Sequence, residues 1–276
     1  MSAIPDSRAL ALSIRQSALT MCYHKKASHL GGAFSVADVL AVLYGGVMTI
    51  APGQPDAPQR DRLFYSKGHA CTALYAVLAE AGYYDKAALA TFTDNGSHFT
   101  SHVNHKVPGV ELSTGSLGHA LSVAAGVALA GKRRQTGWHT YVIVSDGELD
   151  EGSNWEAILF APHHRLDNLT LVVDYNKIQS FGSTAEVLNL DPLADKFKAF
   201  GWDTLEVDGH DHAALAAALA KDGRAAGKPR AVIAHTVKGK GVDFMEGQLA
   251  WHYKSPSEEQ FRAAMAQLTT TTQEPA

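Results

Sequence analysis

The stretch YVIVSDG, from Tyr141 to Gly147, decides the fold of this chain. Its apolar residues leave no polar face, as is typical of a parallel strand buried between two layers of helices. The run ends at Asp146-Gly147, so a carboxylate and a residue without a side chain follow at once. A second run of the same kind, LTLVVDY at 169–175, is followed by Asn176, thirty residues after Asp146. This spacing fits one strand–helix–strand crossover of a parallel sheet.

Strands and helices alternate along the rest of the chain. The pattern predicts strands at 62–66, 141–146, 169–175, 202–208 and 230–237. It predicts helices at 7–27, 35–44, 69–82, 119–132, 152–163, 191–200, 212–222 and 257–268, the second of them capped by Ser35. The fold class is therefore α/β, a doubly wound and mostly parallel sheet flanked by helices. Residues 1–268 are expected to form one domain, and 269–276 a disordered tail.

The composition is that of a globular protein with an excess of histidine. The chain has 276 residues, a formal net charge of −4, an apolar fraction of 46% and 14 histidines. The near-neutral balance argues against nucleic acid or a membrane surface as a partner. No signal peptide is visible, and the two cysteines exclude a disulfide scaffold, which favours the cytoplasm. Imidazole serves proton transfer and ligation, so the function has to explain the histidines.

The polar residues after the two apolar runs predict a metal site. Carboxyl ends of parallel strands meet at one edge of a sheet, so Asp146 and Asn176 are expected to lie close together. Carboxylate and amide oxygens suit Mg²⁺ or Ca²⁺, and Mg²⁺ held by few protein ligands usually bridges phosphates. Gly147 would let the backbone approach a diphosphate closely. The sequence thus predicts a metal and diphosphate site at this edge.

Other patterns point away from competing chemistries. No G-x-G-x-x-G follows a predicted strand, so a nicotinamide-dependent dehydrogenase is not supported. The segment DGHDH, residues 208–212, contains metal-ligating residue types, but a turn followed by a helix capped by Asp211 accounts for it. The turn-rich stretch 93–118 is expected to be a long irregular loop, and such loops are usually functional.

Several segments together resemble the N-terminal half of the transketolase family. Asp146-Gly147-Glu148 with Asn176-Lys177-Ile178 resembles the thiamine diphosphate signature, with Ser145 where the family usually has glycine. The other matching stretches follow the family's order along nearly the whole chain: SKGHA at 66–70, PGVE at 108–111, TGSLGH at 114–119, DGELDEG at 146–152, KGKGV at 238–242 and WH at 251–252.

The resemblance implies that thiamine diphosphate and Mg²⁺, with Ca²⁺ as an alternative, bind to this chain. Asp146 and Asn176 would bind the metal by their side chains, and Ile178 by its carbonyl group. The residues implied to contact the cofactor are Lys67, His69, Gly115, Ser116, Leu117, Gly147, Glu148, Asn176 and Lys238.

The resemblance also assigns roles to three further histidines and one glutamate. His29, His102 and His252 match histidines of the substrate channel, where imidazoles would move protons on hydroxyl and carbonyl oxygens. Glu151 matches a carboxylate that links the two cofactor sites across a dimer.

The implied activity is ketol transfer. A two-carbon glycolaldehyde unit would pass from a ketose, expected to be phosphorylated, to an aldose. After Trp251-His252 only one predicted helix, 257–268, remains, which is too little for the pyrimidine-binding domain of the family. The chain is therefore interpreted as the N-terminal subunit of a split transketolase. A separate C-terminal, pyrimidine-binding subunit would complete an α2β2 assembly.

Three alternatives stay open at this point. The chain could be a subunit of another thiamine enzyme, such as the alpha subunit of a 2-oxo-acid dehydrogenase, although the channel histidines speak against it. A 1-deoxyxylulose-phosphate synthase would be a longer single chain. A non-catalytic regulatory module could retain a cofactor fold, but Asp146, Asn176, His29 and His252 argue against such decay.

Overall fold

The computed structural model describes residues 6–270. Five strands and twenty elements in all are formed by this part of the chain, with η marking 3₁₀ and π helices. In chain order they are α1 (Ser7–Lys25), α2 (Leu30–Ser35), α3 (Ala37–Val42), η1 (Leu43–Val47), β1 (Arg62–Tyr65), η2 (Gly68–Ala70), α4 (Cys71–Glu80), η3 (Lys86–Thr91), α5 (Ala120–Arg134), β2 (Thr140–Ser145), η4 (Gly147–Asp150), α6 (Gly152–His163), β3 (Leu169–Tyr175), α7 (Thr184–Val187), α8 (Leu193–Phe200), β4 (Asp203–Asp208), α9 (His212–Leu219), β5 (Arg230–His235), η5 (Leu249–His252) and α10 (Glu258–Thr270).

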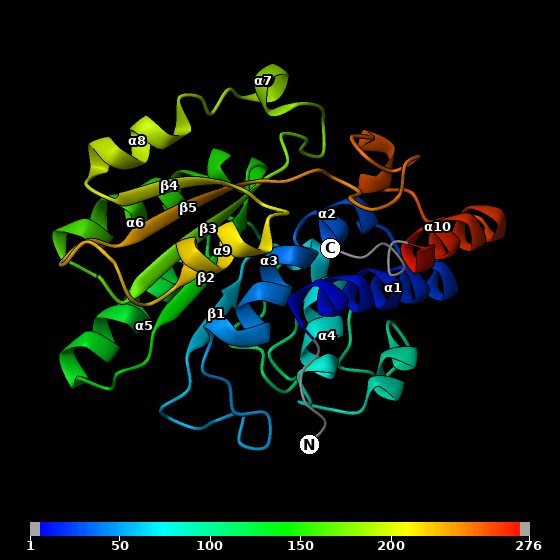
Figure 1. Ribbon diagram of the computed structural model, residues 1–276, viewed down its shortest axis with the longest axis horizontal. Coiled ribbons are helices and arrows are strands. Elements are labelled where there is room, and N and C mark those ends of the chain that lie inside the picture. Colours follow the sequence, from blue (N-terminus) through cyan, green and yellow to red (C-terminus); the bar gives the residue numbers. More distant parts are fainter. Residues whose placement is uncertain (1–5, 271–276) are drawn as a thin grey trace.

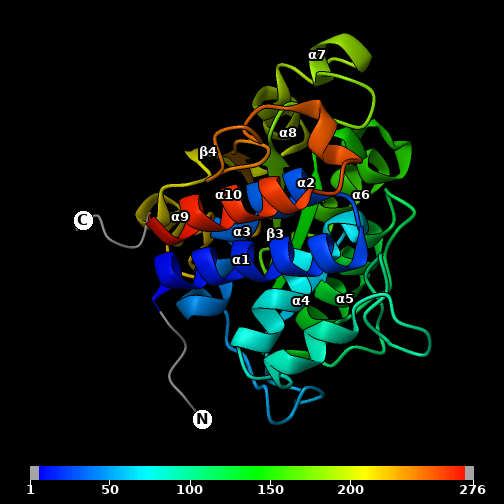
Figure 2. The same ribbon diagram turned by 90° about the vertical axis from the view of Figure 1, so that its right-hand side faces the viewer.

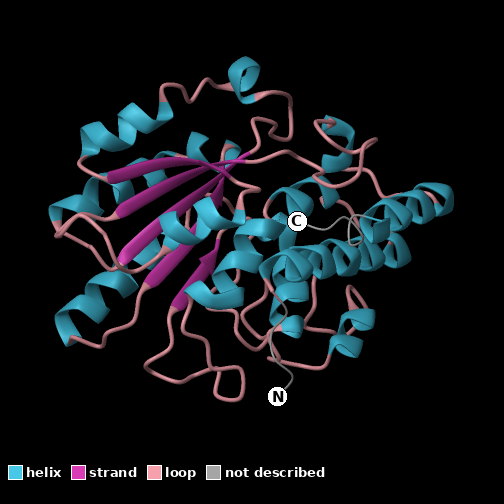
Figure 3. Cartoon of the chain, in the orientation of Figure 1, coloured by secondary structure: helices cyan, strands magenta, loops and turns pink. Residues whose placement is uncertain are grey.

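One parallel sheet forms the centre of the molecule (Figures 1 and 3). Its strand order is β1-β2-β3-β5-β4, and every neighbouring pair is parallel. The chain moves from β1 to β3 in one direction, crosses to β4 at the edge and returns to β5. A return of this kind places helices on both faces and opens a crevice at the carboxyl ends of the strands. The predicted doubly wound sheet is confirmed.

The two faces of the sheet bury separate cores because neighbouring residues of a strand point to opposite faces. In β2, Tyr141 and Ile143 pack into a core shared with α1, α3, α4 and α9. Val142 and Val144 pack into the other core, which is shared with α5, α6 and α8. All residues of β2 and β3 are buried, which is why both read as continuous apolar runs. In Figure 2, α1 lies between α10 and α4 on the outer side of the first core.

One predicted helix has the wrong start and the wrong cap, although α3 and η1 do cover 37–47. The sequence predicts a helix over 35–44 capped by Ser35, but α2 ends at Ser35 and α3 begins at Ala37. Glycine disfavours a helix, so Gly31 and Gly32 conceal α2 in the sequence. Packing requires a small residue here, since a Cβ on Gly31 would lie 2.9 Å from Cγ of Lys238. Ser35 donates its hydroxyl to Asp174 at 2.6 Å instead of capping a helix.

The last helix, α10, extends into the segment that the sequence predicts to be a tail. Residues 269 and 270 of the predicted tail belong to α10, and 271–276 lie outside the described residues. No helix within 6–270 is both long and apolar enough to cross a membrane.

Candidate functional site

A cavity of about 240 Å³ opens at the carboxyl edge of the sheet. The ends of β1, β2, β3 and β5 contribute to it, together with α2 and η5. It brings together eleven of the predicted site residues from segments far apart in sequence: His29, Lys67, His69, Gly115, Leu117, Asp146, Gly147, Asn176, Ile178, Lys238 and His252.

Asp146 and Asn176 occupy the strand ends that the sequence assigns to them. Asp146 is 2% exposed and accepts the backbone N–H groups of Gly147 and Lys177 at 2.7 and 2.6 Å. Burial, together with the nearby charge of Asp174, raises the pKa of Asp146 to about 6. Asn176 accepts the N–H group of Ile178 through Oδ1 at 3.1 Å. This set of buried oxygens fits a hard cation such as Mg²⁺ or Ca²⁺, whose charge would favour the ionised carboxylate.

Gly147 forms part of the cavity wall without a side chain. A Cβ at this position would lie 2.7 Å from Cβ of Gln179, so no larger residue fits without movement of the backbone. The position lies directly after Asp146 and therefore beside the predicted cation. The absence of a side chain leaves room for a phosphate group against the backbone.

Lys238 crosses the cavity from the loop after β5. It is 2% exposed, and its ammonium group donates to the carbonyl of Ile178 at 2.8 Å. It also lies 3.0 Å from Nδ1 of His252. Burial lowers the pKa of Lys238 to about 8. This lysine therefore contacts a predicted metal ligand and a predicted channel histidine at the same time.

Four histidine rings meet at the mouth of the cavity. The ring centre of His29 lies 5.1 Å from that of His252, 5.4 Å from that of His69 and 6.1 Å from that of His102. Burial lowers the pKa of His29 to about 4, that of His252 to about 3 and that of His69 well below its usual value. These three imidazoles are therefore neutral at pH 7, as a group that accepts a proton must be.

Lys67, one of the predicted cofactor residues, is fully buried at the base of the cavity. Its ammonium group donates to the carbonyl of Gly32 at 2.9 Å and forms an ion pair with Asp174. Asp174 also accepts hydroxyl groups from Ser35 and Thr236. Burial works to raise the pKa of Asp174, but Lys67 and these hydrogen bonds hold it below its usual value. The pair ties β1 to β3 under the site.

Four predicted site residues do not line the cavity. Glu148 is buried and accepts the hydroxyl of Ser66 and the N–H group of Gly118, so it anchors the loop that carries Gly115 and Leu117. His102 and Ser116 are exposed beside the mouth. Glu151 is exposed and lies against the same loop. A Cβ added at Gly118 would lie 2.7 Å from the Cβ of Glu151.

Sequence reasoning missed several residues that belong to the site. The cavity is also lined by Gly32, Ser145, Gln179, Ser180 and Tyr253. Most of them directly follow or precede a predicted site residue, so adjacency in the sequence was the signal that could have identified them. Asp174 has a signal of its own, since it is the one charged residue in the apolar run LTLVVDY.

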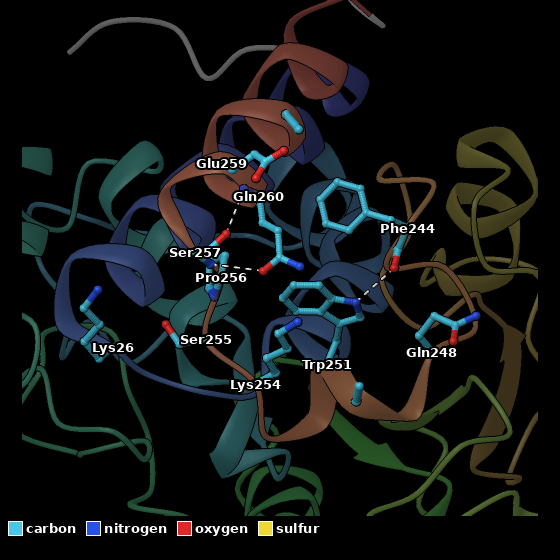
Figure 4. A pocket seen from close by; sticks show the side chains of 12 residues that line it. Lys26, Phe244, Gln248, Trp251, Lys254, Ser255, Pro256, Ser257, Glu259 and Gln260 are labelled. Carbon is cyan, nitrogen blue, oxygen red and sulfur yellow. Dashed lines mark hydrogen bonds between the residues drawn. The ribbon is translucent and has the colours of Figure 1, made fainter.

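A larger hollow is lined by residues on both sides of His252 in the sequence, among them Trp251 and Lys254 (Figure 4). Its volume is about 1040 Å³, and none of the predicted site residues lines it. Trp251 lines this hollow; its ring is buried, and its indole N–H donates to the carbonyl of Phe244 at 3.0 Å. Lys254 lies over the same ring, 5.1 Å from its centre. The next residue, His252, lines the smaller cavity instead.

The DGHDH segment has the predicted structure. Asp211 caps α9 by accepting the N–H groups of Ala213 and Ala214. His210 and His212 both contact Asp38 rather than a shared metal position. Within residues 6–270, no group of three or more His, Cys, Asp or Glu side chains has the geometry of a metal site.

A family model described as the transketolase thiamine diphosphate-binding domain matches residues 6–275. The chain is 44% identical over 241 residues to the 6-deoxy-6-sulfo-D-fructose transketolase subunit SqwG of a Clostridium species, and the match covers 87% of this chain and 88% of that one. It is 38% identical over 255 residues to an apulose-4-phosphate transketolase subunit of Phocaeicola vulgatus, covering 92% and 91% of the two chains.

Solved structures of transketolases have the same fold. The transketolase from Leishmania mexicana superposes with a TM-score of 0.89 at 31% sequence identity. The match covers 96% of this chain but 42% of that one, so this chain spans about two-fifths of the length of the solved enzyme.

Proposed function

The chain belongs to the transketolase family and forms its thiamine diphosphate-binding domain, and we propose that it is the N-terminal subunit of a split enzyme that transfers ketol groups. One observation carries this proposal. Asp146 and Asn176 meet His29, His69 and His252 at a single cavity, although widely separated parts of the chain supply them. Metal ligands next to neutral imidazoles are the parts that a cofactor-dependent proton-transfer site needs.

The residues at the base of the cavity are assigned to metal and cofactor binding. Asp146, Asn176 and the carbonyl of Ile178 would hold Mg²⁺ or Ca²⁺, whose charge would offset that of a diphosphate beside Gly147. The other residues assigned to the cofactor are Lys67, His69, Gly115, Ser116, Leu117, Glu148 and Lys238. Of these, Lys67 and Glu148 act from below, by fixing β1, β3 and the loop at 115–118. When bound, thiamine diphosphate supplies the nucleophilic carbon and the electron sink for carbon–carbon bond cleavage.

Proton transfer falls to the histidines at the mouth. His29 and His252 each use Nδ1 in a contact, with Ser28 and with Lys238. Their Nε2 atoms have no hydrogen-bond partner among the described residues, which leaves them free to exchange protons with substrate hydroxyl and carbonyl oxygens. His102 stands at the edge of this group. The lowered pKa values of His29 and His252 keep these two rings in the neutral form that starts such an exchange.

A second subunit is expected to cover the open side of the site. Gly115, Ser116 and His102 are exposed around the cavity mouth, although they belong to the matched motifs. The two bacterial relatives are named as transketolase subunits and have nearly the length of this chain. A C-terminal, pyrimidine-binding subunit in an α2β2 assembly, with Glu151 near the contact between cofactor sites, agrees with both facts. The composition and the two buried, unpaired cysteines fit a cytoplasmic location.

Reconstitution tests the proposal. The chain is purified alone and with its partner subunit, and both are assayed with Mg²⁺, with and without thiamine diphosphate, on a panel of ketose donors and aldose acceptors. The panel includes 6-deoxy-6-sulfo-D-fructose and apulose 4-phosphate, the sugars in the names of the two relatives. Ketol transfer is expected only from the pair and only with the cofactor. Turnover by the isolated chain, or turnover that ignores thiamine diphosphate, would contradict the split-enzyme proposal.

A further inference from the structure

The DGHDH segment packs against the strand end that leads to Lys238. Gly209 donates its N–H group to the carbonyl of His235 at 2.8 Å, and a Cβ on this glycine would lie 2.4 Å from the side chain of Thr236. Only glycine lets the turn after β4 come this close to the end of β5. The approach places the ring of His210 beside the backbone of Val237.

His210 connects that backbone to a buried carboxylate. Its Nε2 atom accepts the N–H group of Val237 at 2.9 Å, and its Nδ1 atom lies 2.6 Å from Oδ2 of Asp38. A backbone amide can only donate, so Nε2 carries no proton and the ring proton sits on Nδ1, facing Asp38. Both ring nitrogens are therefore committed, and a second proton would break the contact with Val237.

Asp38 is a rigid anchor for this bridge. Its carboxylate is 5% exposed and also binds Arg15 and His212. Burial works to raise the pKa of Asp38, but Arg15 and the hydrogen bonds from His210 and His212 hold it well below its usual range. The carboxylate thus stays charged and keeps accepting the proton on Nδ1 of His210.

Val237 directly precedes the lysine that crosses the cavity. The neighbouring amides of Thr236 and Gly239 donate to the backbone carbonyls of Tyr175 and Gly31, whereas the amide of Val237 donates to a side chain. Lys238 then reaches the carbonyl of Ile178 and the ring of His252. A shift at Val237 would move this ammonium group relative to a metal ligand and a channel histidine.

We propose that His210 is a positioning residue, which sets the place of Lys238 by holding the N–H group of Val237. The inference rests on the proposed function for its effect on the cofactor, but its structural part stands independently. His212 provides a matched control, because it contacts Asp38 at 3.1 Å and Ser7 at 2.8 Å but forms no hydrogen bond or ion pair with residues 236–241.

The first test measures thiamine diphosphate binding with Mg²⁺ by calorimetry on the complex of the chain with its partner subunit. His210→Ala is expected to weaken binding about tenfold, the size of one well-placed hydrogen bond, whereas His212→Ala leaves it unchanged. In a Lys238→Met background, His210→Ala is expected to add little, because the effect runs through Lys238. Equal losses in both histidine variants, or full additivity with Lys238→Met, would overturn the inference.

The second test needs no cofactor. Amide hydrogen exchange of residues 236–241 is expected to speed up in His210→Ala and not in His212→Ala, and unchanged exchange in both contradicts the role of His210. His210→Gln offers a new acceptor for the amide and should restore slow exchange. If His210→Ala does not fold, His210→Phe keeps the ring volume, lacks the acceptor and is held to the same expectation. A wild-type complex that binds no thiamine diphosphate would refute the proposed function, while the exchange data would still decide this inference.

Discussion

Two histidine-containing polar clusters within the described residues differ in what their ring nitrogens do. In the cavity cluster, defined as His29, His69, His252, Lys238 and Asp146, the Nε2 atoms of His29 and His252 have no hydrogen-bond partner among the described residues. In the anchor cluster, defined as Arg15, Asp38, His210 and His212, both nitrogens of each ring are engaged.

The difference separates reactive groups from structural ones. A side chain with all its partners in place contributes to stability and cannot exchange protons without losing a contact. A buried group with a vacant position costs stability, and it is retained where chemistry uses it. The cavity cluster is therefore expected to matter for activity and the anchor cluster for folding. Each prediction below tests this division.

The largest effect is expected at the mouth of the cavity. His29 has a backbone φ of 72°, so His29→Asn is the suitable variant, because asparagine tolerates this conformation. Loss of the imidazole should lower kcat of the reconstituted enzyme by about 10²–10⁴-fold, with little change in the unfolding midpoint. His212→Asn should show the reverse, a lower midpoint with nearly unchanged kcat. If both variants lose kcat alike, the division between the clusters is wrong.

The anchor cluster is expected to give the largest change in stability. Asp38→Asn leaves the Arg15 charge buried without its counter-ion, which costs about 3–5 kcal/mol of unfolding free energy in comparable cases. Urea denaturation followed by circular dichroism measures this loss. Asp195→Asn serves as the control, because its pair with Lys198 is exposed and contributes below about 1 kcal/mol. A loss at Asp38 no larger than at Asp195 would show that the cluster does not stabilise the fold.

The floor of the cavity is expected to affect the cofactor rather than the fold. Asp146→Ala removes a predicted metal ligand, so the Kd of thiamine diphosphate in the presence of Mg²⁺ should rise about hundredfold or more in the assembled complex. The raised pKa shows that the fold disfavours this charge, but two backbone N–H groups donate to the carboxylate, so its removal should lower the unfolding midpoint less than Asp38→Asn does. Calorimetry and thermal unfolding measure the two properties. Unchanged affinity would rule out Asp146 as a ligand.

The smallest expected effect is on the pH dependence of stability. The pKa values of His29 and His252 are lowered by burial to about 4 and about 3 in the folded chain, below the ordinary value of about 6.5 for an unfolded one. The unfolded chain therefore takes up protons first, and stability falls as the pH drops from about 6.5 toward 4.

The variant His29→Asn tests the contribution of one ring to this fall. Over the same pH range, its unfolding free energy should decrease less steeply than that of the wild type. The difference between the two slopes should stay below about 1 kcal/mol per pH unit. Parallel curves for the two proteins would mean that His29 is already protonated in the folded chain near pH 6.

The positions of the strands could be predicted from the sequence because local patterns encode them. All five strands lie where the sequence pattern predicts them, and Asp146 and Asn176 lie at the ends of β2 and β3, the two strands that are buried throughout. Burial on both faces requires a continuous apolar run, which is visible without any knowledge of the partner strands. The helix α2 was not visible, because Gly31 and Gly32 are there for a contact with distant side chains rather than for helix formation.

The site could be predicted in membership but not in arrangement. The matched motifs identified eleven lining residues. Of these, Lys67 uses its charge in an ion pair with Asp174, while Glu148 lies beneath the cavity and His102 stands beside it. Motif membership records which residues a family uses, whereas burial and hydrogen-bond partners depend on elements that are far apart in the sequence.

The sequence by itself determined the succession of strands and helices along the chain, the residues at the strand ends and the kind of chemistry that these residues suit. These features follow from side-chain type and spacing along a short stretch of chain. The motif match separated His29 from His210 by position, but only the tertiary structure decided which ring nitrogens are available for reaction. Asp38 and Val237 occupy both nitrogens of His210, while Nε2 of His29 remains open at the cavity. That distinction depends on contacts between residues up to 172 positions apart, which no local pattern records.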